Sequence, residues 1–381
     1  MRIAIVHGND GSDVRIGKMC RSLSRMGHDV HFIGWDRRLD TEKEVDLGQA
    51  TPHIIVHKTR FGRASVAGQF HFFLHIARTL AKLRPQVVQC VNEDFALLVL
   101  PFRDLFYQRL VCDVFDSLVE RHSNMPLPVL WVLRIVSELV RSGADRLIAT
   151  DAARFERFGR YRRKCVIVEN VPEDPGDELS RGFPSGAAKI YVAGTLHENR
   201  GLRQIIEVAQ RVENLEIVSA GWLYDDYANH VFAGHPKVSF KGIVTARQSL
   251  RLAAQCDAVL AFYAPTSVNN LYASPNKIYD AMSVGRPVII NSDIRVAQWV
   301  LNNKVGWACR YDDIEGLEEI VLGLQSARAS LSTSAARLRE LYASGCTWAR
   351  MEKRLMALYE GLAPGPWCEK ASPDERPASR P

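Results

Sequence analysis

The sequence predicts an α/β protein with two domains, each built on a parallel β-sheet that is covered by helices. The chain has 381 residues, of which 47% are hydrophobic and 24% charged, and this length is typical of about two globular domains. Short apolar runs typical of buried strands alternate with segments of helical spacing from the first residue onward. A polar stretch rich in Pro and Gly, residues 173–187, divides this series into two halves.

The first half begins with an apolar run at residues 2–6 that predicts a buried strand. In the next segment, Ile16, Met19 and Leu23 share one helical face. Gly27 ends this helix, because glycine readily adopts the left-handed conformation that closes a last turn. Repeated strand–helix units of this kind favour a parallel sheet with helices on both faces. The predicted elements are strand 2–6, helix 16–26, strand 29–34, helix 70–83, strand 86–91, helix 129–142, strand 146–150 and strand 166–169.

The second half repeats the pattern after the polar stretch. We expect an N-terminal Rossmann-like domain at 1–172, a linker at 173–187, a C-terminal Rossmann-like domain at 188–345 and a frayed tail at 363–381. The strands are predicted at 190–193, 215–220, 238–240, 258–262 and 287–291, and the helices at 202–212, 246–255, 275–284, 314–330, 333–342 and 348–362.

Charge and cysteine content restrict the class of protein. The net charge of +6 belongs to the first half, since residues 1–172 carry 26 Lys and Arg against 19 Asp and Glu. This asymmetry indicates an anionic partner, either a membrane surface or nucleic acid. No apolar run approaches the roughly 18 residues of a membrane span, and the first residues lack a signal-peptide pattern. The eight cysteines show no metal-ligand spacing, which favours free thiols in a reducing cytoplasm.

Residues 273–289 form the most specific motif. Ser274 predicts an N-cap and Pro275 the first residue of a helix. Lys277 then lies in the first turn, where a cation opposes the helix dipole, and this indicates a bound anion that the helix N-terminus would also attract. Asp280 lies one turn further and could accept hydrogen bonds from both hydroxyls of a ribose. The alternative is an ordinary capped helix with a Lys–Asp pair.

A second motif, residues 193–202, joins a predicted strand to a helix. Gly194 and Gly201 allow the backbone to approach a ligand, and Arg200 stands at the entrance of the helix. Loop amides, helix dipole and guanidinium together favour a diphosphate site, although many such loops contain glycines. The loop at 7–13 lacks the Gly-x-Gly-x-x-Gly pattern, so it does not predict dinucleotide binding, and a plain turn is its alternative.

These segments together resemble a retaining family-4 glycosyltransferase, one of the glycosyl transferases group 1, with the GT-B fold. In that fold two Rossmann-like domains face each other across a cleft, and a C-terminal helix, here 346–362, crosses back to the N-domain. The resemblance implies transfer of a sugar from a nucleotide diphosphate sugar to a hydroxyl with retention of configuration, without a metal or other cofactor. It covers the chain to about residue 362 and is carried by residues 13–15, 27–30, 166–172 (VIVENVP), 194–202, 238–242 (VSFKG), 256–260, 274–289 and 348–362.

The resemblance also implies roles for matching residues. Asp280 stands where the family has a glutamate that holds the ribose, and Arg200 and Lys277 would face the leaving diphosphate. Two positions depart from the family: Thr195 replaces an arginine, and Tyr272 replaces a glutamate near the donor sugar. The nature of the sugar is therefore not predicted, and a weakened or inactive enzyme is an alternative. The donor-binding set implied is Gly194, Thr195, Arg200, Asn276, Lys277 and Asp280.

The candidate catalytic residues lie in the N-terminal domain, which the resemblance assigns to the acceptor. Asp10, Asp94 and Asp116 follow apolar strand patterns, and Asp116 is expected to orient a sugar or an acceptor hydroxyl. Each carboxylate has an ordinary turn or helix-cap role as its alternative. Histidines such as His7 are expected to be ordinary surface or loop groups.

Two basic segments, 154–164 and 58–82, combine cations with aromatic residues. This composition suits an anionic bilayer surface, single-stranded nucleic acid or a solvated helix end. With the family resemblance, we expect a lipid-linked or glycan acceptor, no nucleic acid, and a cytoplasmic protein bound peripherally to the inner face of the plasma membrane. The alternative functions are a noncatalytic sugar-nucleotide-binding or scaffold protein and a sugar-nucleotide epimerase of the same fold.

Overall fold

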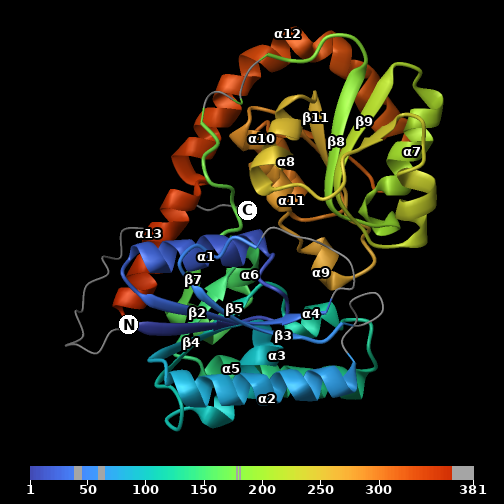
Figure 1. Cartoon of the computed structure of the whole chain (residues 1–381). Helices are drawn as coiled ribbons and strands as arrows, with labels where there is room; N and C mark the ends of the chain where they lie inside the picture. The colour runs from blue at the N-terminus through green and yellow to red at the C-terminus, as the bar shows by residue number, and fades with distance from the viewer. Residues whose placement is uncertain (38–44, 59–64, 177–178, 180–181, 363–381) are drawn as a thin grey trace. The chain divides into compact units, whose positions relative to one another are not determined.

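The computed structural model describes residues 1–362 except 38–44, 59–64, 177–178 and 180–181. Contacts divide the chain into two compact units (Figure 1). Among the described residues, unit 1 contains Met1–Glu169 and the chain from Met351 to Leu362, and unit 2 contains Asn170–Arg350. Each unit is an α/β domain with a parallel sheet, so the expected fold class is confirmed. The expected tail at 363–381 lies outside the described residues.

Unit 1 is built on a seven-stranded sheet in the order β3-β2-β1-β4-β5-β6-β7, and every adjacent pair is parallel. The central strands are apolar and buried over almost their full length, as a sheet covered on both faces requires. The strands are β1 (Arg2–Val6), β2 (Asp29–Asp36), β3 (Thr51–Val56), β4 (Val87–Val91), β5 (Arg109–Val114), β6 (Arg146–Ala149) and β7 (Cys165–Ile167).

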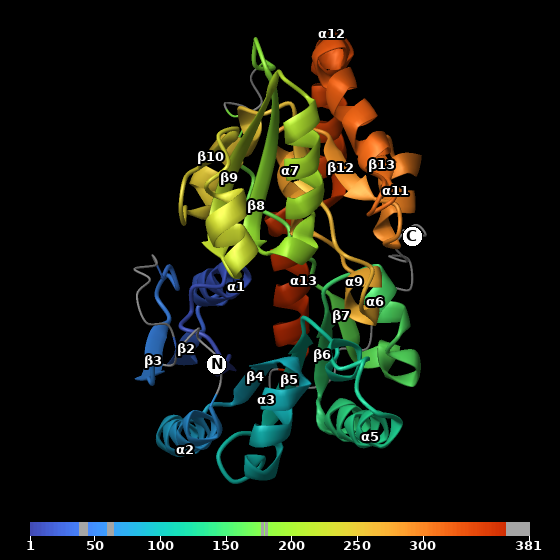
Figure 2. The ribbon, with the colours of Figure 1, turned by 90° about the vertical axis from the view of Figure 1, so that its right-hand side faces the viewer.

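Helices cover both faces of this sheet. Figures 1 and 2 show α2, α3 and α5 on one face, and α1 and the C-terminal α13 on the other. Phe72, Ile76 and Leu80 of α2 pack in one core with Ala96 of α3 and Val140 of α5. The helices of unit 1 are α1 (Val14–Arg25), α2 (Val66–Leu83), α3 (Asn92–Val99), α4 (Leu118–Arg121), α5 (Leu127–Gly143), α6 (Ala152–Glu156), the 3₁₀ segments η2 (Leu100–Phe102) and η3 (Gly159–Lys164), and most of α13 (Trp348–Glu360).

Unit 2 has a six-stranded parallel sheet in the order β10-β9-β8-β11-β12-β13. Its strands are β8 (Ala188–Leu196), β9 (Leu215–Leu223), β10 (Val238–Phe240), β11 (Ala258–Ala261), β12 (Val288–Asn291) and β13 (Gly306–Cys309), and its helices are the 3₁₀ turn η5 (Glu198–Arg200), α7 (Leu202–Arg211), the π-helical η6 (Tyr227–Phe232), α8 (Ala246–Ala254), α9 (Val268–Leu271), α10 (Asn276–Ser283), α11 (Val296–Asn302) and α12 (Ile314–Gly345).

Helix α12 differs from the prediction of two helices at 314–330 and 333–342. It is one helix of 32 residues. Ser330 and Thr333, the last and first residues of the two predicted helices, donate their hydroxyls to carbonyl oxygens of the preceding turn, at Ala327 (2.8 Å) and Ala329 (3.4 Å). Both side chains thus bond to the helix itself, and the helix continues through them.

The described part of the chain contains neither a membrane-spanning helix nor a disulfide. None of the helices in the described part of the chain combines the length and the hydropathy of a membrane span. The seven cysteines that the structure describes are buried free thiols, in agreement with the sequence, and burial raises the pKa of the Cys20 thiol to about 12. Cys368 lies outside the described residues.

Strands β8 and β9 bring two glycines together, since Gly194 pairs with Gly221. Gly221 has φ +142°, and a Cβ there would lie 1.9 Å from the Gly194 oxygen. We therefore expect Gly221→Ala to destabilise the protein by about 1–3 kcal/mol in chemical denaturation, because backbone must move apart. Gly323→Ala is the control, since its Cβ meets nothing within 4 Å and alanine favours a helix. Equal stability of the two variants would contradict this packing.

Candidate functional site

The polar residues predicted in unit 2 gather where β8 ends and α10 begins. Gly194 has φ +113°, a conformation that favours glycine. A Cβ built on it would lie 3.9 Å from Cε of Lys277, so the lysine side chain passes close to this backbone. Thr195 follows as an exposed residue of β8, and Asn276 is the first residue of α10. The end of one strand and the start of one helix thus supply four of the predicted residues.

Lys277 is a cation held in the first turn of α10. Its Nζ lies 2.7 Å from Oδ2 of Asp280, and the two side chains are only 15% and 16% exposed. Burial alone would lower the pKa of Lys277, but Asp280 and the nearby hydroxyls of Tyr191 and Tyr263 raise it above its ordinary value. The Lys–Asp pair of the alternative interpretation is therefore present, and Asp280 positions the ammonium group of Lys277.

The helix does not begin as predicted. Pro275, rather than Ser274, occupies the N-cap, with ψ 122°, and no described side chain caps the first turn. The extended backbone of Pro275 moves the start of the helix one residue along, away from the reach of the Ser274 hydroxyl. The Ile278 N–H donates to the Pro275 oxygen at 3.1 Å, while no hydrogen bond within the described residues uses the amides of Asn276 and Lys277, which are left to a ligand or to water.

Arg200 stacks on Tyr263, a residue that also affects the pKa of Lys277. Its guanidinium carbon is 3.7 Å from the centre of the Tyr263 ring, and its Nε is 3.3 Å from Nε2 of His197. The same tyrosine hydroxyl contributes to the raised pKa of Lys277. Tyr263 therefore interacts with both cations, and its backbone N–H donates to Asn291 Oδ1 at 2.8 Å. Two cations, a helix N-terminus and an open glycine backbone form a site suited to a multiply charged anion such as a diphosphate.

The three carboxylates predicted in unit 1 separate into two environments. Asp10 accepts hydrogen bonds from Ser12, and Asp94 pairs with Arg121 at 3.1 Å. Asp116 instead pairs with Arg154 at 3.2 Å. All three lie just after parallel strands, at the edge where α/β sheets bind ligands. Their partners differ, because Asp94 pairs with Arg121 whereas Asp116 pairs with Arg154.

Asp10 and Asp94 both raise the pKa of His7, which we expected from the sequence to be an ordinary surface or loop group. The imidazole lies edge-on to Phe95 and Phe115, with ring centres 6.4 and 5.8 Å away. Its Nδ1 is buried and has no hydrogen-bond partner among the described residues. Burial lowers the pKa of His7, against the opposing charges of Asp13, Asp94 and Asp10. The apolar pocket comes from residues more than 85 positions away, so no local pattern could reveal it.

We expect His7 to be neutral at pH 7 and to titrate below the value of about 6.5 found for a histidine in a peptide. The pKa is lowered in the folded state, so protonation favours unfolding, and this contribution to stability is lost as the pH falls below about 6.5 through the folded pKa. NMR titration of the imidazole protons, with His7→Gln to assign the signal, measures the midpoint. A midpoint at or above the peptide value would show that His7 is not desolvated.

No group of three or more His, Cys, Asp or Glu side chains within the described residues is placed to hold a metal ion. In unit 2, Lys277, Arg200 and the backbone amides at the start of α10 are groups that could meet the charge of a bound anion.

Comparisons with known proteins give a family for part of the chain. Residues 187–326, which include the whole of the site in unit 2, match the family described as glycosyl transferases group 1. No curated protein sequence matches the chain.

Solved structures show the fold of the whole chain. Sucrose-phosphate synthase from Thermosynechococcus elongatus is 14% identical, with 95% of this chain and 99% of that chain covered and a TM-score of 0.70. Anabaena HepE in complex with UDP and glucose is 15% identical, with 94% and 99% covered and a TM-score of 0.71. WaaG, a glycosyltransferase involved in lipopolysaccharide biosynthesis, is 13% identical, with 93% and 99% covered and a TM-score of 0.64. The chain therefore has the two-domain GT-B fold of these structures.

Proposed function

We propose that this protein is a retaining glycosyltransferase that moves a sugar from a nucleotide diphosphate sugar to a hydroxyl of a lipid-linked or surface polysaccharide precursor. The observation that carries the proposal is the partly buried Lys277–Asp280 pair in the uncapped first turn of α10, beside the Gly194 backbone. The family match over 187–326 supports it, as does the UDP and glucose in the HepE structure.

In this proposal the residues of unit 2 stabilise charge. When the bond between the sugar and the diphosphate breaks, the electron pair stays on the diphosphate, and Lys277 and Arg200 face that charge with the amides of α10. Asp280 accepts hydrogen bonds from the ribose, while Gly194, Thr195 and Asn276 shape the surroundings of the phosphates. These groups supply the positive charge without a metal ion.

The acceptor side belongs to unit 1. We assign acceptor binding to the N-terminal domain, 1–172, and donor binding to the C-terminal domain, 188–345. The linker 173–187 joins the two domains, and the helix 346–362 returns the chain to the N-terminal domain. Asp116 would orient the acceptor hydroxyl. Asp10 and Asp94, which both influence the pKa of His7, would contribute to the same task. The excess of cations in 1–172 supports peripheral association with the anionic inner face of the plasma membrane.

An assay with UDP-, GDP-, ADP- and dTDP-sugars and a lipid acceptor extract tests the function. Release of one nucleoside diphosphate that depends on the acceptor is the expected result, and NMR of the product's anomeric proton measures retention. Binding without turnover would favour the noncatalytic alternative, for which Tyr272, stacked on Arg295 at 4.6 Å, is the motivating residue. Release of a free epimer of the donor sugar would instead indicate an epimerase.

A further inference from the structure

Helix α5 of unit 1 carries large apolar side chains on its outer side. Ser137 and Val140 face the sheet and are buried, as the inner side of a covering helix must be. The opposite side is not polar, although that is the usual pattern of a surface helix. Its exposed apolar residues, called here the α5 stripe, are Leu127 (78% exposed), Trp131 (64%), Val132 (53%), Ile135 (47%) and Leu139 (51%).

The stripe is one continuous surface. Positions 131, 135 and 139 are four residues apart and therefore lie above one another on a helix, with 132 beside them. Val66 (85% exposed) and Phe70 (60%) of helix α2 form a separate apolar patch, because α3 lies between α2 and α5 in Figure 2. Contiguous exposed apolar surface of this kind marks a site of interaction with a partner protein or a membrane.

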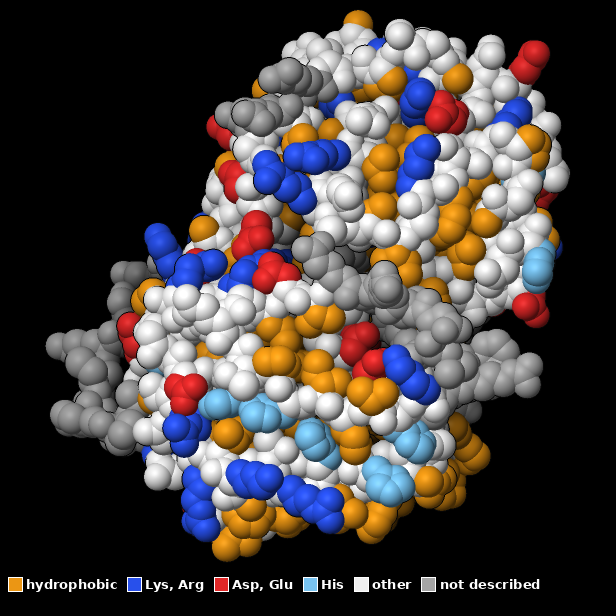
Figure 3. Space-filling view, viewed as in Figure 1, with side chains coloured by type: hydrophobic (Ala, Val, Ile, Leu, Met, Phe, Trp, Pro, Cys, Tyr) orange, Lys and Arg blue, Asp and Glu red, His pale blue; other side chains and the backbone are white. Residues whose placement is uncertain are grey.

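Cations border the stripe. Figure 3 shows the side of unit 1 that carries α2, where hydrophobic side chains and several Lys and Arg also gather, and the cations beside α5 follow from the contacts of the neighbouring η3 segment. The η3 segment lies against α5, since Lys164 Nζ donates to the Ser142 and Ala144 oxygens at 3.0 and 2.6 Å, and Arg160 pairs with Glu138 at 2.7 Å. Arg163 of the same segment is exposed and forms no ion pair or hydrogen bond with the described residues.

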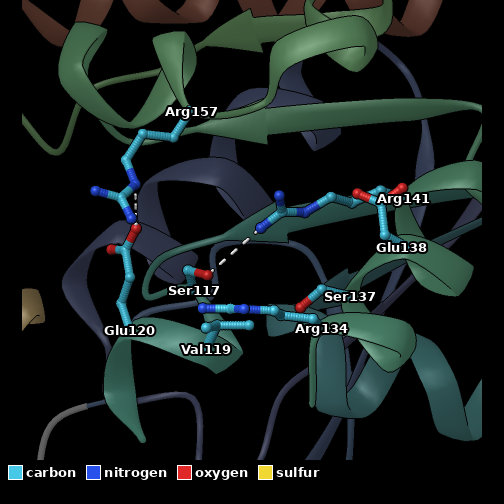
Figure 4. Close-up of a pocket in the computed structure, with 8 residues that line it drawn as sticks. All are labelled: Ser117, Val119, Glu120, Arg134, Ser137, Glu138, Arg141 and Arg157. Atoms are coloured by element: carbon cyan, nitrogen blue, oxygen red, sulfur yellow. Dashed lines mark hydrogen bonds and ion pairs between the residues drawn. The ribbon is translucent and has the colours of Figure 1, made fainter. Parts of the chain in front are cut away.

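Arg134 on α5 is a second available cation. It lines a pocket of about 320 Å³ together with Arg141 and Arg157 (Figure 4). Arg141 is bound to the buried Glu93 at 2.7 Å, and Arg157 to Glu120 at 2.6 Å. Arg134 has no such partner within the described part of the chain, so its charge is not neutralised by the protein. It lies one turn from Trp131, between the pocket and the stripe.

We propose that the α5 stripe, with Arg134 and Arg163 beside it, docks this protein on the surface of an anionic lipid bilayer. The apolar side chains would lie at the level of the acyl boundary, Trp131 would occupy the interface, and the arginines would contact lipid phosphates. A second copy of this chain fits less well, because a symmetric contact would place the same unpaired arginines against each other. The inference deepens the proposed peripheral association and does not require sugar transfer.

The test is sedimentation of the full chain with vesicles of phosphatidylcholine alone or mixed with phosphatidylglycerol. The wild type should bind the anionic vesicles, and a variant with Trp131→Glu and Ile135→Glu should bind on the order of tenfold more weakly or less. Arg134→Gln should weaken binding by about fivefold, in a salt-dependent manner. Leu322→Glu is the matched control, since Leu322 is 58% exposed on helix α12 of unit 2, and should bind as the wild type does.

Three results would overturn the inference: no binding of the wild type to anionic vesicles, equal binding by the double variant, or a wild-type dimer that the double variant abolishes. Circular dichroism checks the fold of each variant, and Trp131→Ser replaces the double variant if that one is unfolded. Nucleotide binding by the same samples separates the two proposals. Vesicle binding without nucleotide binding counts against the proposed function alone, and the reverse counts against the docking surface alone.

Discussion

Lys277→Met is expected to lower kcat/KM for sugar transfer by about 100- to 1,000-fold, the size of effect found when one stabilising donor is removed from an enzyme. Methionine keeps the length of the side chain over Gly194 but removes the charge. Asp280 and Tyr263 hold the pKa of Lys277 above its ordinary value, so the wild-type ammonium is charged at any pH at which the enzyme would work. The loss should fall mainly on kcat, because charge on the diphosphate grows as the sugar leaves.

Two variants control this result. Lys277→Arg keeps the charge and should retain more activity than Lys277→Met. Lys241→Met removes an exposed lysine of unit 2 and should leave kcat/KM unchanged. If Lys277→Met were as active as Lys241→Met, Lys277 would have no part in stabilising the leaving group.

Arg15→Met is expected to lower the free energy of unfolding by about 3–5 kcal/mol, because it leaves a buried carboxylate without its cation. Arg15 of α1 is 1% exposed, and its Nη2 lies 3.0 Å from Oδ1 of Asp113, which is 0% exposed. Burial raises the pKa of Asp113 and Arg15 opposes that shift. The network continues through Gln89, which bonds Asp113 at 3.3 Å and accepts from the Tyr359 hydroxyl of α13 at 2.5 Å.

Denaturation of Arg15→Met should be compared with Arg21→Met on the same helix. Arg21 pairs with Asp46 at 2.6 Å, but the two side chains are 21% and 61% exposed, so its loss should cost at most about 1 kcal/mol. A double variant with Arg15→Met and Asp113→Asn should recover part of the stability, since no charge is then left buried. Equal destabilisation by Arg15→Met and Arg21→Met would show that the buried Asp113 carboxylate does not need the charge of Arg15.

Strong local patterns predicted most of the fold. Strand β1 (Arg2–Val6) has the predicted bounds, because a buried strand reads as an apolar run. Of the four edge strands, β10 (Val238–Phe240) also has the predicted bounds and β7 was predicted within two residues, but β3 and β13 were missed. β3 contains Pro52 and His53 and β13 has only four residues, and neither an edge position nor a short strand requires such a run.

The candidate site was predicted as far as sequence neighbours define it. Lys277 and Asp280 are three residues apart, so helix geometry alone brings them together, and the structure confirms the contact. The stacking of Arg200 on Tyr263 and the pocket of His7 join residues distant in sequence. They depend on which strands are neighbours in the sheet, which the pattern of one chain does not specify.

The central claim is that the start of α10 with Gly194 binds the diphosphate of a nucleotide. Isothermal calorimetry with UDP, GDP, ADP and dTDP, on the wild type, Lys277→Ala and Asp280→Ala, tests it most directly. We predict that one nucleotide binds the wild type and that both substitutions weaken its binding. Failure of the folded wild type to bind any of the four, or equal binding by both variants, would contradict the claim.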